Sequence, residues 1–241
     1  MADNGAVPSN PYPVNPRWVL AEDITDAVRR RYPAEVQAVG VHGSLAHGDD
    51  ADGSDVDLIV VTFRAGAGPH PGSRRIDGVI VELGVIAGED YLGYARTLST
   101  SWPLTADQYL TTKSLYDPRG WYDRLRDAHL ARLAEANGGE FASLARTAWC
   151  QAETTYARAI RLAERYDTAG ALLAMGEARV SAALVEGLLT RTYFRGGADA
   201  MARTGLGDTD LTELGRRLRT QADELARRGR PVDATVAELV T

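Results

Sequence analysis

Two aspartates alternate with apolar residues in the stretch S-D-V-D-L-I-V at residues 54–60, and this pattern constrains the fold more than any other. Successive side chains of a β-strand point to opposite faces of a sheet, so Asp55 and Asp57 are predicted to share one face, with Val56 and Leu58 on the other. Two carboxylates about 4 Å apart repel each other by on the order of 4 kcal/mol at an effective dielectric constant of about 20. A bound divalent cation would remove that penalty, and Mg²⁺ prefers such oxygen ligands.

A Gly-Ser pair, Gly43-Ser44, stands eleven residues before Asp55 and directly follows an apolar strand pattern at Val36–Val41. We expect the strand to end in this pair and a short helix to begin there. Free backbone N–H groups at such a turn bind anions, and glycine allows a phosphate to approach closely. A Gly-Ser turn or an Asp-x-Asp pair alone is usually a plain turn or a solvated strand, but their combination favours a catalytic site.

A second apolar strand pattern, at Ile76–Ile86, carries a lone carboxylate, Glu82, near its centre. A buried glutamate is rare unless it is paired or binds a metal, so Glu82 is predicted to be a buried metal ligand. The alternative is a glutamate that simply points to solvent. Asp77-Gly78 is typical of a tight turn. The Gly- and Pro-rich residues 64–75 are predicted to be a connection without regular structure.

These residues resemble the signature of the polymerase-β-like nucleotidyltransferase superfamily, in which an apolar strand and Gly-Ser precede Asp-x-Asp and a further acidic strand residue. The resemblance is greatest to the kanamycin (aminoglycoside 4′-O-) nucleotidyltransferases and covers about residues 24–125. It extends through three further matches: Trp102-Pro103-Leu104-Thr105, Gln108, and Leu115-Tyr116-Asp117 with Gly120.

The resemblance implies Mg²⁺-dependent transfer of a nucleoside monophosphate, usually AMP from ATP, to a hydroxyl of an aminoglycoside, with release of pyrophosphate. Such a reaction would confer antibiotic resistance. The family works as a homodimer whose site lies between subunits. The site residues that the resemblance implies are Gly43, Ser44 and Ser54 for the triphosphate, Asp55, Asp57 and Glu82 for two Mg²⁺ ions, and Asp55 and Asp57 as catalytic residues.

The resemblance also implies a general base, a glutamate that directly precedes a Tyr-Ala pair in the helical domain. In this chain Tyr156-Ala157 follows Thr155, and the nearest carboxylate is Glu153. Glu153 is therefore the predicted base. The alternative is that Glu153 forms an ion pair with Arg146 or Arg158.

Two further positions depart from the kanamycin enzymes. His47 stands where they have an arginine, and Ile80 where they have a lysine. Arginines of the helical region, such as Arg158 or Arg161, would replace the lost positive charge near the phosphates. Otherwise turnover is slower or the acceptor differs.

Composition and charge narrow the class of partner. The net charge of −6 falls entirely in residues 1–137, which hold 13 basic and 19 acidic residues, whereas residues 138–241 hold 14 of each. The absence of a basic track argues against a nucleic-acid substrate, and the acidic excess suits a small cationic acceptor. The single cysteine favours a reducing compartment, and no run is apolar enough for a membrane span. We expect a cytoplasmic protein without membrane contact.

The predicted architecture is α+β with two domains. Residues 1–137 are expected to form a nucleotidyltransferase domain with a mixed β-sheet, in which residues 1–16 are extended or disordered. Asn137-Gly138-Gly139 is the strongest break. Residues 138–241 are expected to form an all-α bundle for acceptor binding and dimerisation, with helices at 140–166, 168–194 and 210–228.

Three other functions remain open at this stage. The same chemistry on a nucleoside or another natural product would use the same metal and nucleotide residues. A nucleotidyltransferase-type antitoxin would modify or bind a protein, although a short single domain is expected for that class. A non-catalytic nucleotide-binding module would not need the full set of Asp55, Asp57 and Glu82.

Overall fold

The computed structural model describes residues 15–240, which form two compact units. The first takes in the chain up to Asp90 together with Thr112–Tyr122, and the second takes in Tyr91–Thr111 and the chain from Asp123 onward. Residues 1–14 of the expected extended segment lie outside the described residues. The functional boundary at residue 137 stays a prediction.

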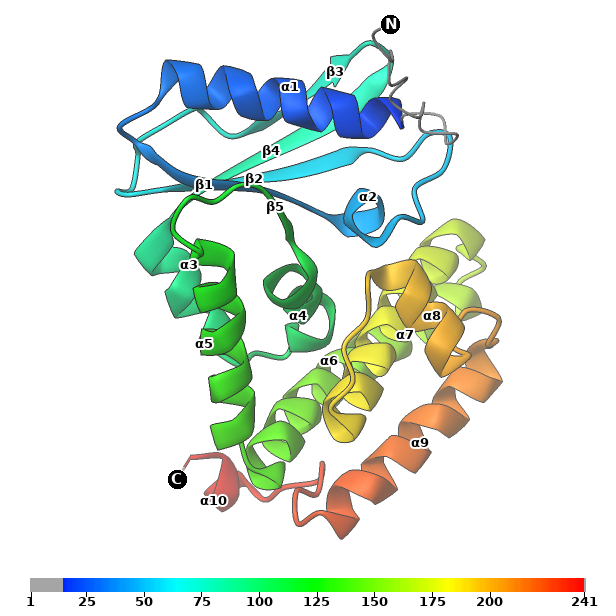
Figure 1. The fold of residues 1–241 in the computed structure, drawn as a ribbon. Coiled ribbons are helices and arrows are strands. Elements are labelled where there is room, and N and C mark those ends of the chain that lie inside the picture. The colour runs from blue at the N-terminus through cyan, green and yellow to red at the C-terminus, as the bar shows by residue number, and fades with distance from the viewer. Residues whose placement is uncertain (1–14, 241) are drawn as a thin grey trace, which may run out of the picture. The chain divides into compact units, whose positions relative to one another are not determined.

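The first unit is built on one mixed sheet of five strands in the order β3-β4-β2-β1-β5 (Figure 1). Strands β2 and β4 run parallel, and the other neighbours are antiparallel. The predicted α+β class, a mixed sheet followed by a helical region, is confirmed. The strands are β1 (Val36–His42), β2 (Val56–Thr62), β3 (Gly72–Ile76), β4 (Val79–Ala87) and β5 (Lys113–Tyr116).

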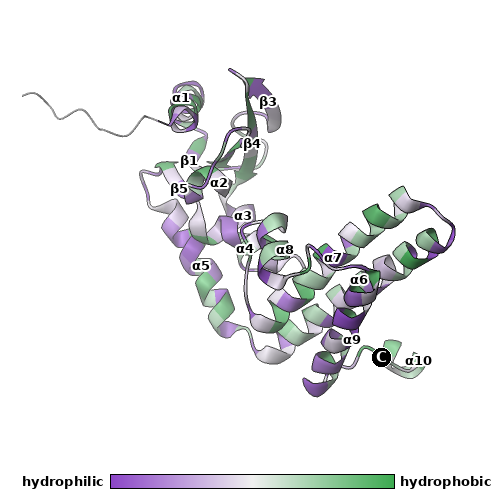
Figure 2. Cartoon of the chain, turned by 90° about the vertical axis from the view of Figure 1, so that its right-hand side faces the viewer, coloured by the Kyte–Doolittle hydropathy of each residue, from purple (hydrophilic) through white to green (hydrophobic). Residues whose placement is uncertain are grey.

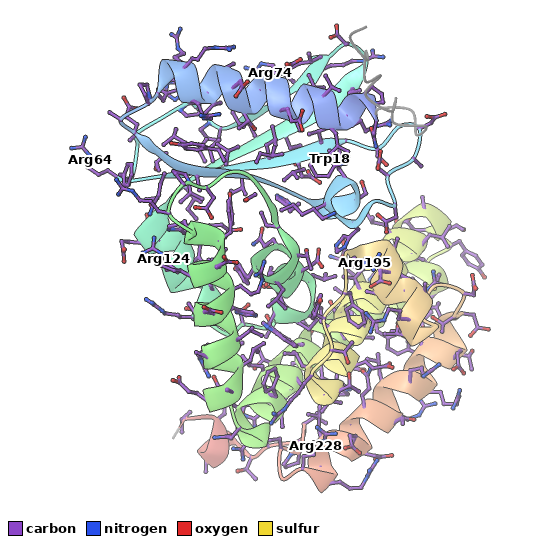
Figure 3. The ribbon with its side chains drawn as sticks, in the orientation of Figure 1. Trp18, Arg64, Arg74, Arg124, Arg195 and Arg228 are labelled. Carbon is purple, nitrogen blue, oxygen red and sulfur yellow. The ribbon has the colours of Figure 1, made fainter. Side chains whose placement is uncertain are left out.

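Helix α1 (Pro16–Arg31) lies along one face of this sheet. The Asn15 side chain caps it by accepting a hydrogen bond from the Arg17 N–H, and Pro16 occupies its first turn, where no N–H is needed. Its apolar residues pack on the inward side chains of β1 and β2, including Val56 and Leu58, and Trp18, labelled in Figure 3, joins that cluster. The predicted alternation therefore holds, and we call the opposite face, which carries Asp57, the carboxylate face.

Strand β3 was not predicted, because residues 64–75 were expected to form only a connection. The strand lies at the edge of the sheet, and its residues Gly72–Arg75 are exposed, so it lacks the apolar alternation that marks a half-buried strand. The expected turn at Asp77-Gly78 joins it to β4. Both turn residues have positive φ, 48° and 86°, as tight two-residue hairpins require.

Within the first unit, a glycine allows the segment of residues 112–122 to approach the carboxylate face closely. A Cβ on Gly40 would lie 2.6 Å from Thr112 and 2.7 Å from the Tyr122 ring. The Tyr122 hydroxyl donates a hydrogen bond of 3.0 Å to the carbonyl oxygen of Ile59 on β2. The segment is thus fixed to the middle of the sheet.

The second unit is helical. Helices α6 and α7 lie side by side in Figures 1 and 2 and meet through small buried alanines, such as Ala152 and Ala182, which allow close packing. No helix among residues 15–240 is long and apolar enough to cross a membrane. Besides α1, the helices of both units are α2 (Gly43–His47), α3 (Gly88–Ala95), α4 (Trp102–Thr111), α5 (Trp121–Glu135), α6 (Gly138–Glu164), α7 (Thr168–Thr190), α8 (Gly197–Thr204), α9 (Leu211–Arg227) and α10 (Val236–Leu239).

Two helix boundaries differ from the sequence prediction. The predicted break at residues 137–139 is the start of α6, because Asn137 accepts a hydrogen bond from the Glu140 N–H and the two glycines form the first turn. The expected helix 168–194 ends at Thr190, and the short helix α8 follows it. Gly196 caps α8, and Gly197 is its first residue.

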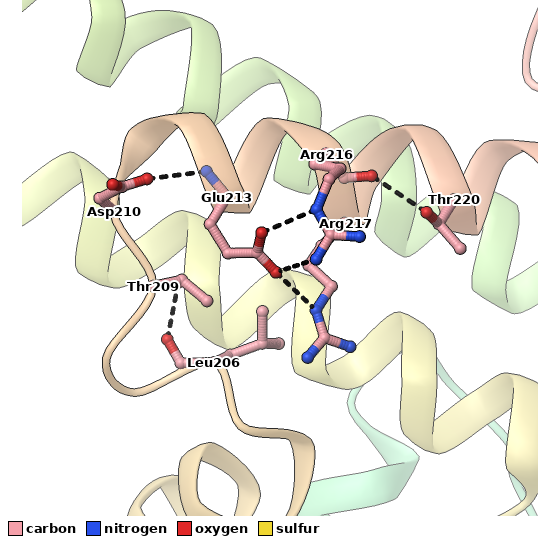
Figure 4. Close-up of polar contacts among 7 residues, drawn as sticks. All are labelled: Leu206, Thr209, Asp210, Glu213, Arg216, Arg217 and Thr220. Atoms are coloured by element: carbon pink, nitrogen blue, oxygen red, sulfur yellow. Dashed lines mark hydrogen bonds and ion pairs between the residues drawn. The ribbon is translucent and has the colours of Figure 1, made fainter.

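Helix α9 matches its predicted range and amphipathic character. The Asp210 side chain accepts a hydrogen bond from the Glu213 N–H, and the Glu213 carboxylate accepts hydrogen bonds from Arg216 and Arg217 (Figure 4). These ion pairs lie at the helix surface, where each contributes little to stability. The helix is held mainly by its buried leucines, such as Leu214 and Leu218.

A buried histidine organises the part of the second unit that precedes α6. His129 on α5 is fully buried; its Nε2 accepts a hydrogen bond of 3.2 Å from the Trp102 indole N–H, and its Nδ1 lies 2.6 Å from the carbonyl oxygen of Ala95. The ring is therefore the neutral form with the proton on Nδ1. Burial lowers the pKa of His129, although the bond to Ala95 acts in the opposite direction.

Candidate functional site

Three neighbouring strands bring a row of polar side chains together on the carboxylate face. Asp57 on β2 is in register with Glu82 on β4 and with His42, the last residue of β1. Directly paired residues on adjacent strands share a face and lie about 5 Å apart. The row Glu82, Asp57, His42 therefore crosses the sheet at the end where β1 meets α2.

The electrostatics show that the predicted carboxylates are close neighbours. Burial, together with the nearby Asp55 and Glu82 carboxylates, raises the pKa of the Asp57 carboxyl to about 6. Neighbouring negative charges disfavour ionisation of a carboxyl group, and a bound cation would reverse this effect. Asp55 and Glu82 therefore lie near enough to Asp57 to act on its charge, and the binding of a metal by the three residues stays a prediction.

Glu82 itself is exposed, and the expectation that it is buried is wrong. The physical reason is that, within the first unit, α1 covers only one face of β4. Val81 lies on the covered face, and Glu82 points to the opposite face. Its partners on the two adjacent strands are Asp57 and Ser73, both polar. An apolar run in the sequence marks a strand but does not say that both faces are covered.

Gly43 is held directly against Asp57. A Cβ at this position would lie 2.4 Å from Asp57 Oδ2, and the backbone φ of Gly43 is +70°, which favours glycine. Helix α2 begins at Gly43, as expected, and Ser44 is its second residue. The sequence suggested glycine here for the approach of a phosphate; the structure gives a second reason, room for the Asp57 carboxylate.

The loop before Asp55 is tied to the start of α1. Arg17 Nε donates a hydrogen bond of 3.0 Å to the carbonyl oxygen of Ser54, and Arg17 Nη1 lies 3.6 Å from Asp50 Oδ2. Asn15 also donates to Asp50, at 2.9 Å. The Asp50 side chain is only 8% exposed, although it lies in an acidic loop. Its burial is compensated by the cation and the amide.

The donor set of this site suits Mg²⁺, because it consists of carboxylates whose mutual repulsion raises a pKa. Among residues 15–240, however, no group of three or more His, Cys, Asp or Glu side chains is arranged as a ready metal site. Asp55, Asp57 and Glu82 thus share a neighbourhood without converging on one point. They remain the residues that would hold a metal.

Glu153 lies on α6 in the second unit and is half-buried. No ion pair joins Glu153 to Arg146 or Arg158 in the described part of the chain, and Arg158 pairs with Glu177 instead. The ion-pair alternative for Glu153 is therefore not formed. Its role as a base stays a prediction.

Sequence reasoning missed two neighbours of the site, His42 and Arg17. Each is placed by register or by a contact distant in sequence, which no local pattern encodes. The position of His42 in the sequence gave one signal. Because it directly precedes Gly43, it is the last residue of β1 and therefore lies next to the Gly-Ser turn.

Residues 21–88 match the nucleotidyltransferase domain family, and this range takes in Gly43, Asp55, Asp57 and Glu82. The chain contains a nucleotidyltransferase domain. Of these residues, Asp57 and Glu82 are directly paired in the register of β2 and β4, at the end of the carboxylate face where β1 meets α2.

Characterised relatives of this nucleotidyltransferase domain include two proteins named aminoglycoside nucleotidyltransferase (4′), from Staphylococcus aureus and from a Bacillus species. Each is 27% identical over 109 residues, which is 45% of this chain and 43% of the relative. The chain thus matches less than half the length of these relatives. A solved structure of a nucleotidyltransferase-like protein from Exiguobacterium sibiricum 255-15 is 15% identical, with a TM-score of 0.44 over 86% of this chain and 73% of that chain.

Proposed function

We propose that this protein is an Mg²⁺-dependent nucleotidyltransferase that transfers a nucleoside monophosphate, AMP from ATP, to a hydroxyl of a small cationic acceptor of the aminoglycoside class. The observation that carries the proposal is the register of Asp57 with Glu82, beside Gly43 and within the electrostatic influence of Asp55. Carboxylates that destabilise one another in the free protein are suited to bind cations that accompany a triphosphate.

The reaction is a displacement at the α-phosphorus of the triphosphate. The acceptor hydroxyl oxygen forms a bond to that phosphorus, the bond to the β-phosphate oxygen breaks, and pyrophosphate leaves. The hydroxyl proton passes to a base, for which we propose Glu153. When bound by Asp55, Asp57 and Glu82, two Mg²⁺ ions would neutralise charge on the attacking and leaving oxygens.

In this proposal Gly43, Ser44 and Ser54 hold the triphosphate. Ser54 is half-buried at the end of the loop that Arg17 fixes, and its hydroxyl accepts a hydrogen bond of 3.0 Å from the Ala51 N–H. That bond uses an acceptor lone pair and leaves the hydroxyl proton to donate to a phosphate oxygen. The fixed loop would therefore present Ser54 without a large rearrangement.

The acceptor class rests on two supports. The relatives that match residues of the nucleotidyltransferase domain are named for aminoglycosides. The acidic excess of residues 1–137 favours a cation by long-range attraction. We also propose that the helical residues 138–241 bind the acceptor and that the protein acts as a homodimer, as the resemblance implies.

The test is incubation of the protein with Mg²⁺, ATP or another nucleoside triphosphate, and a panel of aminoglycosides, nucleosides and other hydroxylated compounds. The expected product is an acceptor that has gained the mass of one nucleoside monophosphate, together with pyrophosphate. Asp57→Asn should abolish transfer, whereas Asp52→Asn, an exposed aspartate of the preceding loop, should not. Glu153→Gln tests the base separately.

The outcomes distinguish the alternatives. Mass gain only on a nucleoside or another natural product would replace the acceptor class and keep the chemistry. Labelling of a protein would favour the antitoxin function. Nucleotide binding without transfer to any acceptor would favour a non-catalytic binding module.

A further inference from the structure

Three cationic side chains lie on the five strands of the sheet: Arg74 and Arg75 on β3, and Lys113 on β5. A triphosphate carries several negative charges, so a cation on the carboxylate face would matter for binding it. The register of the sheet decides which of the three lies on that face.

Lys113 and Arg74 belong to the opposite face. Lys113 pairs with Val41, and its ammonium lies 5.7 Å from the centre of the Trp18 ring of α1. Arg74, labelled in Figure 3, pairs with Val81, which packs in the cluster beneath α1. Directly paired residues share a face, so both cations lie on the α1 side of the sheet.

Arg75 lies on the carboxylate face. It pairs with Ile80, which is two residues from Glu82 on β4 and therefore on the same face. Extending the β2–β4 register by one residue places Asp55 beside Ile80 from the other side. The rows Arg75, Ile80, Asp55 and Ser73, Glu82, Asp57 are thus neighbours on one surface.

Arg75 is within reach of a ligand held at the carboxylates. Diagonal neighbours on paired antiparallel strands lie about 7–8 Å apart, which a long side chain spans. Arg75 is exposed, and its Nε donates a long hydrogen bond of 3.4 Å to the carbonyl oxygen of Gly78. Its guanidinium can therefore exchange this bond for a phosphate.

We propose that Arg75 binds the β- or γ-phosphate of the nucleoside triphosphate and so helps to select a triphosphate over a monophosphate. The proposal rests on the proposed function of this site. Arg75 acts from the edge strand β3, at the side of Glu82 that is remote from Asp57. A guanidinium suits this role because it offers several donors in a planar array.

The test is the equilibrium affinity for ATP and for AMP, each with Mg²⁺ and without acceptor, measured by calorimetry for the parent, Arg75→Ala, Arg75→Lys and Arg74→Ala. Loss of a charge-assisted contact to phosphate should weaken ATP binding by about 10-fold or more in Arg75→Ala. Affinity for AMP should not change, because it lacks the β- and γ-phosphates. Arg75→Lys should retain part of the affinity, since the charge remains.

Arg74→Ala is the matched control, because it removes the same charge from the other face of the same strand. Equal weakening in Arg74→Ala and Arg75→Ala would indicate a general field effect and overturn the proposal. Parental ATP affinity in Arg75→Ala would also overturn it, while leaving the proposed function intact if Asp57→Asn loses transfer. A parent protein that neither binds nor uses any nucleoside triphosphate would overturn the proposed function itself. Equal melting temperatures of the variants establish that they are folded.

Discussion

Replacing Asp57 by asparagine should stabilise the free protein while removing its activity. The Asp57 carboxyl is half-buried beside Asp55 and Glu82, and its pKa rises from 3.8 to about 6. The full shift corresponds to about 3 kcal/mol of destabilisation by the ionised group. Solvent screens a half-buried group, so we expect a gain of about 1–2 kcal/mol in the free energy of unfolding for Asp57→Asn at pH 7.5.

The pH dependence gives the sign of this effect. Between pH 3.8 and about 6 the folded protein binds the Asp57 proton and the unfolded chain does not. The free energy of unfolding contributed by this residue therefore falls as the pH rises through that window and is constant above it. The advantage of Asp57→Asn should be absent near pH 4, appear between pH 4 and 6, and persist at higher pH.

Urea unfolding at a series of pH values measures the effect, and thermal unfolding at pH 7.5 should show a rise of about 2–8 °C, since each kcal/mol shifts the melting temperature of a chain of this size by about 2–4 °C. Asp52→Asn, which removes an exposed carboxylate of the loop before β2, should change stability little. With Mg²⁺ and ATP the order should reverse, because ligand binding stabilises only the parent. An Asp57→Asn protein that is less stable than the parent at pH 7.5, or a difference that does not vary between pH 4 and 7, would refute the reasoning.

Three further predictions follow from other contacts. Gly43→Ala should lower the free energy of unfolding by about 1–3 kcal/mol, because the added Cβ would clash with the Asp57 carboxylate at a residue of positive φ. Gly48→Ala is the control, because Gly48 also has a positive φ but has open space around its Cβ position. Equal losses of stability in the two variants would show that the clash with Asp57 does not matter. Because burial lowers the pKa of His129, the unfolded chain binds its proton first, so stability should fall as the pH drops below about 6.5. His129→Gln should flatten that slope in urea unfolding, and an unchanged slope would exclude His129 as its source. Arg17→Ala should raise the Mg²⁺ concentration needed for half-maximal transfer by about 10-fold, because it removes a charged hydrogen bond to the loop before Asp55. An unchanged Mg²⁺ dependence would show that this hydrogen bond is not needed to position the loop.

The sequence predicted the elements whose burial is periodic. The alternation at residues 55–58 placed Asp55 and Asp57 opposite the core, and β1 and β4 were found from their apolar strand patterns. Strand β3 was not predicted, because an exposed edge strand needs no apolar alternation in its sequence. It became visible only through its pairing with β4.

The candidate site was predicted from local residue patterns, but the burial of its members and the contacts that support them were not. Local patterns indicated Gly43, Asp57 and Glu82, yet the exposure of Glu82 depends on which face α1 covers. The anchoring role of Arg17 depends on a contact 37 residues away, to Ser54. Such contacts follow from the register and the packing of helices, which a single sequence does not specify.

The order in which the chain visits its two units limits how the protein can be dissected. A fragment that stops near Asp90 includes all of residues 21–88 but lacks Thr112–Tyr122, which belongs to the same unit. In this fragment β1 would lack its hydrogen-bonded neighbour β5, and Gly40 would lose its contact with the Tyr122 ring. Exposed strand edges of this kind invite intermolecular pairing. Expression of residues 1–90 on their own should therefore yield insoluble material, and a soluble fragment must also carry residues 91–122.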